Sequence, residues 1–156
     1  MPDAVALGEL LIDFVPTVSG VSLADASAFL KAAGGAPGNV AVGSARLGVS
    51  AGFMGKVGDN PFGHLLAETL AGAGLDLTGL RFTREAQTGL AFVSLGAGGE
   101  RSFLFYRHPS ADMLLTAKEV EEHSEPLCTA QVFHFGSIRL VGEPSRGATL
   151  QAAQIA

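Results

Sequence analysis

Residues 34–58 read GGAPGNVAVGSARLGVSAGFMGKVG, a tight glycine-rich turn followed directly by a run of small residues. The first five, residues 34–38 (GGAPG), are called the glycine turn below. Glycine lets the backbone approach another group closely, and Pro37 suits the first turn of a helix. The first amides of a helix have no partner within it and lie at the positive end of its dipole. We therefore expect the glycine turn and Asn39 to present amide groups to a polar ligand.

The segments that follow the glycine turn alternate between helix and strand patterns. Small residues favour a helix over 39–47, which Gly48 ends, and residues 50–57 predict a buried strand. Asn60 and Pro61 have the types and order of an N-cap and a first-turn proline, and they open a second helix. Such alternation predicts an α/β fold with a parallel, layered sheet.

Upstream of the glycine turn, the apolar run at residues 5–14 (VALGELLIDF) predicts one strand buried on both faces of that sheet. The stretch around Phe29 is expected to pair back as a hairpin. Asp13 then lies at a strand end, where side chains of open α/β sheets reach the ligand crevice. Its carboxylate can accept hydrogen bonds from two adjacent hydroxyls, as a sugar supplies, although a turn or helix-cap role is equally compatible with the sequence.

The second part of the chain changes to a period of two. Residues 88–95 and 101–106 predict two strands of a hairpin around the glycine-rich turn at 96–100. Tyr106 and Arg107 close the second strand, where they either face a ligand or lie in solvent.

Three further elements complete the pattern. Thr116 and Glu119 have the spacing of a capping box, residues 131–138 predict a strand, and a last helix starts near Glu143. This helix has no C-terminal glycine, following proline or basic last turn. We therefore expect the chain to be the front half of a longer protein.

Composition excludes several classes of function. A net charge of -5 with no basic run gives nucleic acid no surface to bind. The single cysteine, Cys128, has no partner for a disulfide or a paired-cysteine zinc site, and the four histidines lack metal-binding spacing. No apolar stretch reaches the roughly 18 residues of a membrane span, and no secretory leader is recognisable. We expect a cytoplasmic protein with no membrane partner.

Taken together, these residues resemble the ribokinase-like sugar kinases of the PfkB family, and most closely the fructokinase subgroup. The first family motif is matched by Gly34, Gly35, Pro37, Asn39, Ala41, Gly48 and Gly58. The subgroup is indicated by GELLIDFVP (8–16), GGAPGNVAVG (34–43), GKVGDNPFG (55–63), FYRHPSADMLL (105–115) and VFHFGSI (132–138). One departure is Gly38, where these fructokinases usually have alanine.

The resemblance implies a three-layer α/β/α sheet with a small β lid formed by about residues 14–33 and 88–107, often used for homodimerisation. It implies phosphoryl transfer from ATP, with Mg²⁺, to a hydroxymethyl group of a sugar, most closely fructose. By position, Asp13, Gly35 and Asn39 would bind sugar hydroxyls, and Gly34 would shape the turn. Arg107 would lie near the sugar or the transferred phosphoryl group, with Tyr106 beside it.

The family's second motif, D-T-x-G-A-G-D, which carries the catalytic base and anion hole, is not found in these residues. The resemblance therefore places no catalytic residue in this chain and most of the ATP site beyond it, and we expect the chain to be inactive alone. Two alternatives stay open. One is a 2-keto-3-deoxygluconate kinase whose substrate carboxylate binds Arg107. The other is a non-catalytic module for sugar binding or dimerisation.

Overall fold

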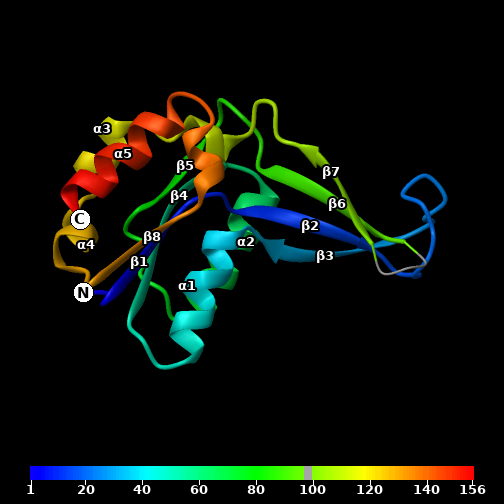
Figure 1. Cartoon of the computed structure of the whole chain (residues 1–156), viewed down its shortest axis with the longest axis horizontal. Helices are drawn as coiled ribbons and strands as arrows, with labels where there is room; N and C mark the ends of the chain where they lie inside the picture. Colours follow the sequence, from blue (N-terminus) through cyan, green and yellow to red (C-terminus); the bar gives the residue numbers. More distant parts are fainter. Residues whose placement is uncertain (97–99) are drawn as a thin grey trace.

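The computed structural model describes residues 1–96 and 100–156, which form two separate four-stranded sheets (Figure 1). The main sheet is parallel, with strand order β5-β4-β1-β8. Its strands are β1 (Ala4–Leu7), β4 (Ala51–Gly58), β5 (Leu80–Thr83) and β8 (Val132–Phe135).

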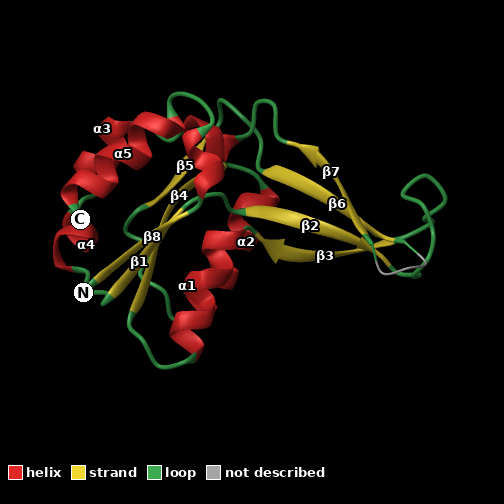
Figure 2. Ribbon diagram, viewed as in Figure 1, coloured by secondary structure: helices red, strands yellow, loops and turns green. Residues whose placement is uncertain are grey.

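Helices cover both faces of the main sheet (Figure 2). They are α1 (Ala36–Arg46), α2 (Pro61–Gly72), α3 (Ala117–Glu122), α4 (Glu125–Thr129) and α5 (Ser145–Ile155), with 3₁₀ helices η1 (Ala111–Leu114) and η2 (Ser137–Leu140). Successive strand residues point to opposite faces. Ala6 and Phe53, paired in register, belong to the core that α1 and α2 cover, whereas Leu7 and Met54 belong to the core under α3, α4 and α5. The predicted three-layer α/β/α arrangement is confirmed.

The helix boundaries follow the predicted local signals. The side chain of Asn60 accepts hydrogen bonds from the amides of Phe62 and Gly63 at the start of α2. The capping box of Thr116 and Glu119 starts α3. α1 begins at Ala36, three residues earlier than expected, because Pro37 is accommodated in its first turn.

The second sheet is mixed and extends away from the helices (Figure 1). Its order is β3-β2-β6-β7, with β2 (Leu11–Pro16), β3 (Phe29–Gly34), β6 (Gly89–Leu95) and β7 (Arg101–Tyr106). The predicted hairpins β2–β3 and β6–β7 are both antiparallel, and β2 and β6 join them in parallel. Of the predicted turn at 96–100, residues 97–99 lie outside the described part. This sheet begins at Leu11 and so is slightly larger than the segments 14–33 and 88–107 predicted for a lid, whose covering role stays a prediction.

Two strand predictions were wrong where strands β1 and β8 of the main sheet end. The run 5–14 is two strands in different sheets, because the chain turns away at Gly8 and Glu9, where a Cβ on Gly8 would collide with Pro37. The predicted strand 131–138 stops at Phe135 and continues into η2. A Cβ on Gly136 would lie 3.0 Å from Pro37 Cγ, so the chain bends closely past the start of α1.

Among the described residues, no helix has the length and apolar character that crossing a membrane requires.

Candidate functional site

The site lies where the strand order of the main sheet reverses. From β1 the chain proceeds to β4 and β5 on one side, whereas β8 is added on the other side of β1. In open α/β sheets, ligands bind in the crevice outside the carboxyl ends of the strands at this switch point. Gly8 and Glu9 follow β1 there, and Gly136 follows β8. The second sheet starts from the same edge, since β2 begins two residues after Glu9.

The glycine turn closes one side of this crevice. Gly34 ends β3, and Gly35, with φ 109°, is the N-cap of α1. A Cβ on Gly35 would collide with the backbone oxygen of Glu9, and one on Gly34 would collide with the carboxylate of Asp13. Because both glycines are packed against other parts of the site, the turn has space for no side chain at either position. Asn39 lies exposed in the first turn of α1.

Asp13 lies in the second sheet rather than at the end of a main-sheet strand as predicted. It is paired in register with Ala32 of β3 and Ala91 of β6, and Ala91 is paired with Phe105 of β7. Paired residues share a face of a sheet, so Asp13 and Phe105 lie on the same face. Partial burial raises the pKa of the Asp13 carboxyl above its ordinary value. The carboxylate is therefore a partly desolvated hydrogen-bond acceptor beside the glycine turn.

The two residues predicted at the end of β7 point in different directions. Tyr106 is 61% exposed and follows Phe105, so it lies on the opposite face, where it packs edge-to-face with Phe92. A sugar contact by Tyr106 stays a prediction, and the structure does not bring this side chain together with Asp13. Arg107 is buried, and its Nη2 donates to Asp112 Oδ2. The guanidinium is thus held by a carboxylate rather than free in solvent.

Three charged residues at this site escape prediction from the sequence: Glu9, Asp112 and Arg139. Glu9 Oε1 accepts a hydrogen bond of 3.3 Å from the amide of Ala36, the first residue of α1. Arg139 is only 1% exposed; its Nη1 donates to the Asp112 carbonyl and lies 3.5 Å from Asp112 Oδ2. Burial lowers the pKa of Arg139, while the carboxylates of Asp112 and Glu9 raise it. The available signal was a charge inside an apolar segment, as in GSIRL at 136–140.

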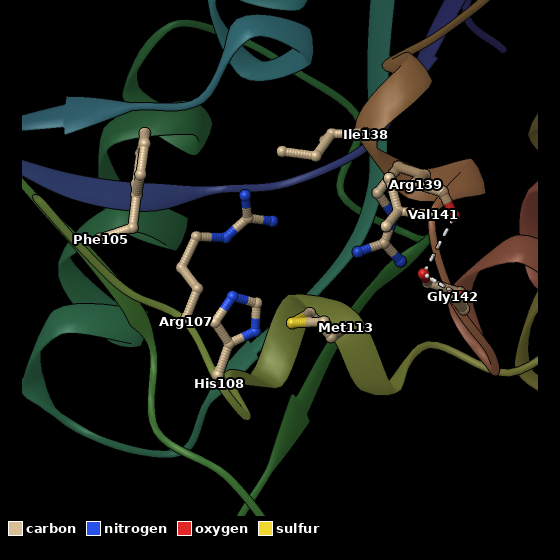
Figure 3. Close-up of a pocket in the computed structure, with 9 residues that line it drawn as sticks. Phe105, Arg107, His108, Met113, Ile138, Arg139, Val141 and Gly142 are labelled. Carbon is tan, nitrogen blue, oxygen red and sulfur yellow. Dashed lines mark hydrogen bonds between the residues drawn. The ribbon is translucent and has the colours of Figure 1, made fainter. Parts of the chain in front are cut away.

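A cavity of about 280 Å³ lies between the end of β7 and η2 (Figure 3). Figure 3 shows Arg107 and Arg139 entering it from two sides, Arg107 from the end of β7 and Arg139 from η2. Its remaining lining residues are Phe105, His108, Met113, Ile138, Val141, Gly142 and Ser145. The cavity thus combines apolar walls with two guanidinium groups whose charges are offset by Asp112 and Glu9.

The described residues include no group of three or more His, Cys, Asp or Glu side chains that could hold a metal ion. The site instead offers the partly buried Asp13 carboxylate and the exposed Asn39 carboxamide, which suit a hydroxyl-rich ligand.

Known proteins share this sequence and fold. The chain matches the pfkB family carbohydrate kinases over residues 1–156. It is 56% identical over 152 residues to fructokinase from Solanum tuberosum and 59% identical over 152 residues to fructokinase-1 from Zea mays. Each match covers 97% of this chain but 47% and 46% of the relative, so the chain spans about half the length of the curated relatives it matches.

Solved structures agree with the sequence relatives. A sugar kinase from Pyrococcus horikoshii in complex with ATP has a TM-score of 0.87 and 37% identity, covering 97% of this chain and 48% of that one. A double mutant of fructokinase from Vibrio cholerae, bound to fructose, ADP and potassium, has a TM-score of 0.84 and 34% identity over 99% of this chain and 46% of that one. The resemblance seen in the sequence is confirmed, and the chain belongs to the pfkB family of carbohydrate kinases.

Proposed function

We propose that this chain carries the sugar-binding half of a fructokinase, which transfers a phosphoryl group from ATP to a hydroxymethyl oxygen of fructose to give fructose 6-phosphate. The observation that carries the proposal is the packing of the Asp13 carboxylate against Gly34 at the switch point of the main sheet. The fructokinase relatives at 56% and 59% identity support fructose as the sugar.

In this proposal Asp13, Gly35 and Asn39 bind sugar hydroxyls. Asp13 accepts hydrogen bonds, Gly35 provides backbone at a position without a side chain, and Asn39 provides an exposed amide at the start of α1. Arg107 follows β7 and packs against Gly89 of β6, where a Cβ on Gly89 would lie 3.3 Å from Arg107 Cγ, and Asp112 balances its charge. This balance favours a neutral sugar over the carboxylate of 2-keto-3-deoxygluconate.

The second sheet is proposed to cover the bound sugar and to pair with a second copy of the chain. Its edge strand β7 is exposed throughout, with Phe103, Leu104, Phe105 and Tyr106 among the exposed large side chains. Apolar surface of this kind is typical of a surface that becomes covered.

ATP, Mg²⁺ and the catalytic aspartate are proposed to belong mainly to the part of the family's length that this chain does not span. Mg²⁺ usually binds through one or two carboxylates, water molecules and substrate phosphates, so in this proposal its site forms around the bound ATP. The glycine turn is filled by Asp13 and the Glu9 carbonyl, which suits a sugar better than a triphosphate. ATP supplies the phosphoryl group, and this chain's contribution is to hold and orient the acceptor.

The test uses the protein produced from its complete gene, with ATP, Mg²⁺ and either fructose or 2-keto-3-deoxygluconate. We expect consumption of ATP with fructose, and Arg107→Ala should weaken the use of fructose without abolishing it. Preference for the acid sugar, with complete loss of that activity in Arg107→Ala, would instead assign the 2-keto-3-deoxygluconate reaction. A native protein whose intact mass is 15.9 kDa would favour a non-catalytic module.

A further inference from the structure

Buried polar atoms without hydrogen-bond partners gather around the crevice. Among the described residues they include Glu9 Oε2, Arg107 Nε, and both Nε and Nη2 of Arg139. Buried polar groups are nearly always hydrogen-bonded, so such a cluster calls for an explanation. All three side chains are buried, and they come from three different places: the end of β1, the end of β7 and η2.

These side chains are connected to the two parts of the proposed sugar site. Glu9 binds the amide of Ala36 and so fixes the glycine turn. Arg139 binds Asp112 through both the backbone carbonyl and the carboxylate. Asp112 in turn accepts hydrogen bonds from Arg107 and from the hydroxyl of Ser110. Apart from the Ser110 hydroxyl, each partner in this set is a charged side chain or a backbone group.

The Glu9 carboxylate lies close to the end of β8, from which the chain continues into η2 and Arg139. A Cβ on Gly136, three residues before Arg139, would lie 3.1 Å from Glu9 Oε2, so the Glu9 carboxylate reaches the end of β8. Burial lowers the pKa of Arg139, and the negative charges of Asp112 and Glu9 act against that shift, so Glu9 stabilises the charged guanidinium. The free oxygen of Glu9 and the free nitrogens of Arg139 are thus complementary in charge and in hydrogen bonding.

We propose that Glu9, Arg139 and Asp112 are positioning residues, which act as one chain of alternating charges between the glycine turn and Arg107. These charges set the distance between the glycine turn, which packs on Asp13, and the Arg107 guanidinium at the end of β7. For its sugar-binding readout this inference rests on the proposed function. None of the three residues needs to touch the sugar.

Removing one charge should displace its neighbours, because the remaining buried charges then lack compensation. Glu9→Gln keeps the shape and the acceptor for Ala36 but removes the attraction to Arg139. Arg139→Met keeps the length and removes the positive charge. The double variant restores charge balance between the two positions, so its defect should be smaller than the two single defects combined.

The first experiment measures fructose phosphorylation by the protein from its complete gene. Each single variant should raise KM for fructose about tenfold and change kcat less than about threefold. The reason is that the variants weaken binding of the substrate and of the transition state equally. The double variant should raise KM by less than about thirtyfold, below the hundredfold product. Arg139→Lys should recover part of the loss. The exposed residues Glu121 and Arg46 provide the controls Glu121→Gln and Arg46→Gln, which should leave KM within about twofold.

The second experiment needs no sugar and separates this inference from the proposed function. In ¹⁵N-labelled protein, the Nε–H resonance of Arg107, assigned with Arg107→Lys, should shift in Glu9→Gln and stay in place in Glu121→Gln. If the wild type fails to phosphorylate fructose, the proposed function is wrong and this resonance still decides the positioning claim. An Arg107 signal unmoved by Glu9→Gln, or KM effects that multiply fully in the double variant, would overturn the chain of charges.

Discussion

The two sheets of this chain have the same number of strands, but one strand from each shows how differently they are exposed. Every residue of β4 in the main sheet is buried, whereas every residue of β7 in the second sheet is exposed. Helices on both faces shield the main sheet, and the second sheet extends into solvent (Figure 1). The difference indicates a division of labour: the main sheet stabilises the fold, and the second sheet is free to contact ligands or partners. The crevice lies where the two sheets meet.

The largest expected effect compares one aromatic residue from each sheet. Phe53 of β4 is 1% exposed and Phe103 of β7 is 52% exposed. Phe53→Ala should lower the free energy of unfolding by about 3–5 kcal/mol, because it leaves a cavity in a packed core. Phe103→Ala should cost less than about 1 kcal/mol. Urea denaturation measures both, and comparable losses would show that the second sheet is as important for stability as the main one.

The next comparison uses Gly35, the N-cap of α1, and Gly43 in the interior of the same helix. Gly35 has φ 109° and no space for a Cβ, whereas a Cβ on Gly43 would meet nothing within 4 Å. Gly35→Ala should cost about 2–3 kcal/mol through backbone strain and the collision with Glu9. Gly43→Ala should stabilise the helix by about 0.5–1 kcal/mol. Thermal unfolding distinguishes the two, and a harmless Gly35→Ala would refute the tight packing of the glycine turn.

Two asparagines at helix starts separate stability from binding. Asn60 caps α2, and its carboxamide also accepts from Thr88 at 3.0 Å and donates to Gln87 at 2.9 Å, just before β6. Asn60→Ala should therefore cost about 1–2 kcal/mol of stability by the loss of a helix cap. Asn39→Ala, at an exposed position, should leave stability nearly unchanged and weaken fructose binding. Calorimetry measures the unfolding of both variants and their binding of sugar. An equal loss of stability in the two variants would contradict this prediction.

The smallest effect on stability is expected for Asp13→Asn. Burial raises the folded-state pKa of Asp13, so the ionised carboxylate slightly destabilises the fold at neutral pH. The asparagine variant should be slightly more stable than the wild type above that raised pKa. The difference should disappear as the pH falls below the ordinary value of 3.8, where Asp13 is protonated in both states. Denaturation at a series of pH values tests this, and a constant difference would exclude Asp13 as its source.

Local signals in the sequence were sufficient for much of the fold. The caps at Asn60 and Thr116 and the two hairpins depend on residues close together in the chain, and they were predicted. The run 5–14 was assigned to one strand because its apolar composition does not reveal that two sheets meet at Glu9. That division depends on the packing of Gly8 against Pro37, a contact between residues far apart in sequence.

The site was predicted in part for the same reason. Gly34 and Gly35 were singled out by a spaced motif and Asp13 by its place near a strand end, and the structure packs Gly34 against Asp13. Their role in sugar binding stays a prediction. Arg139 and Asp112 are separated by 27 residues, and only the tertiary fold brings their charges into contact. The orientation of Tyr106 away from Asp13 depends on strand register, which a single exposed strand does not specify.

The central claim, that this crevice holds the sugar of a fructokinase, is tested most directly with Asp13→Asn in the protein from the complete gene. We expect the wild type to phosphorylate fructose with ATP, and we expect the folded variant to lose about a hundredfold or more in kcat/KM for fructose, about 2.7 kcal/mol. A wild type inactive on fructose, or an Asp13→Asn variant with undiminished kcat/KM, would contradict the account.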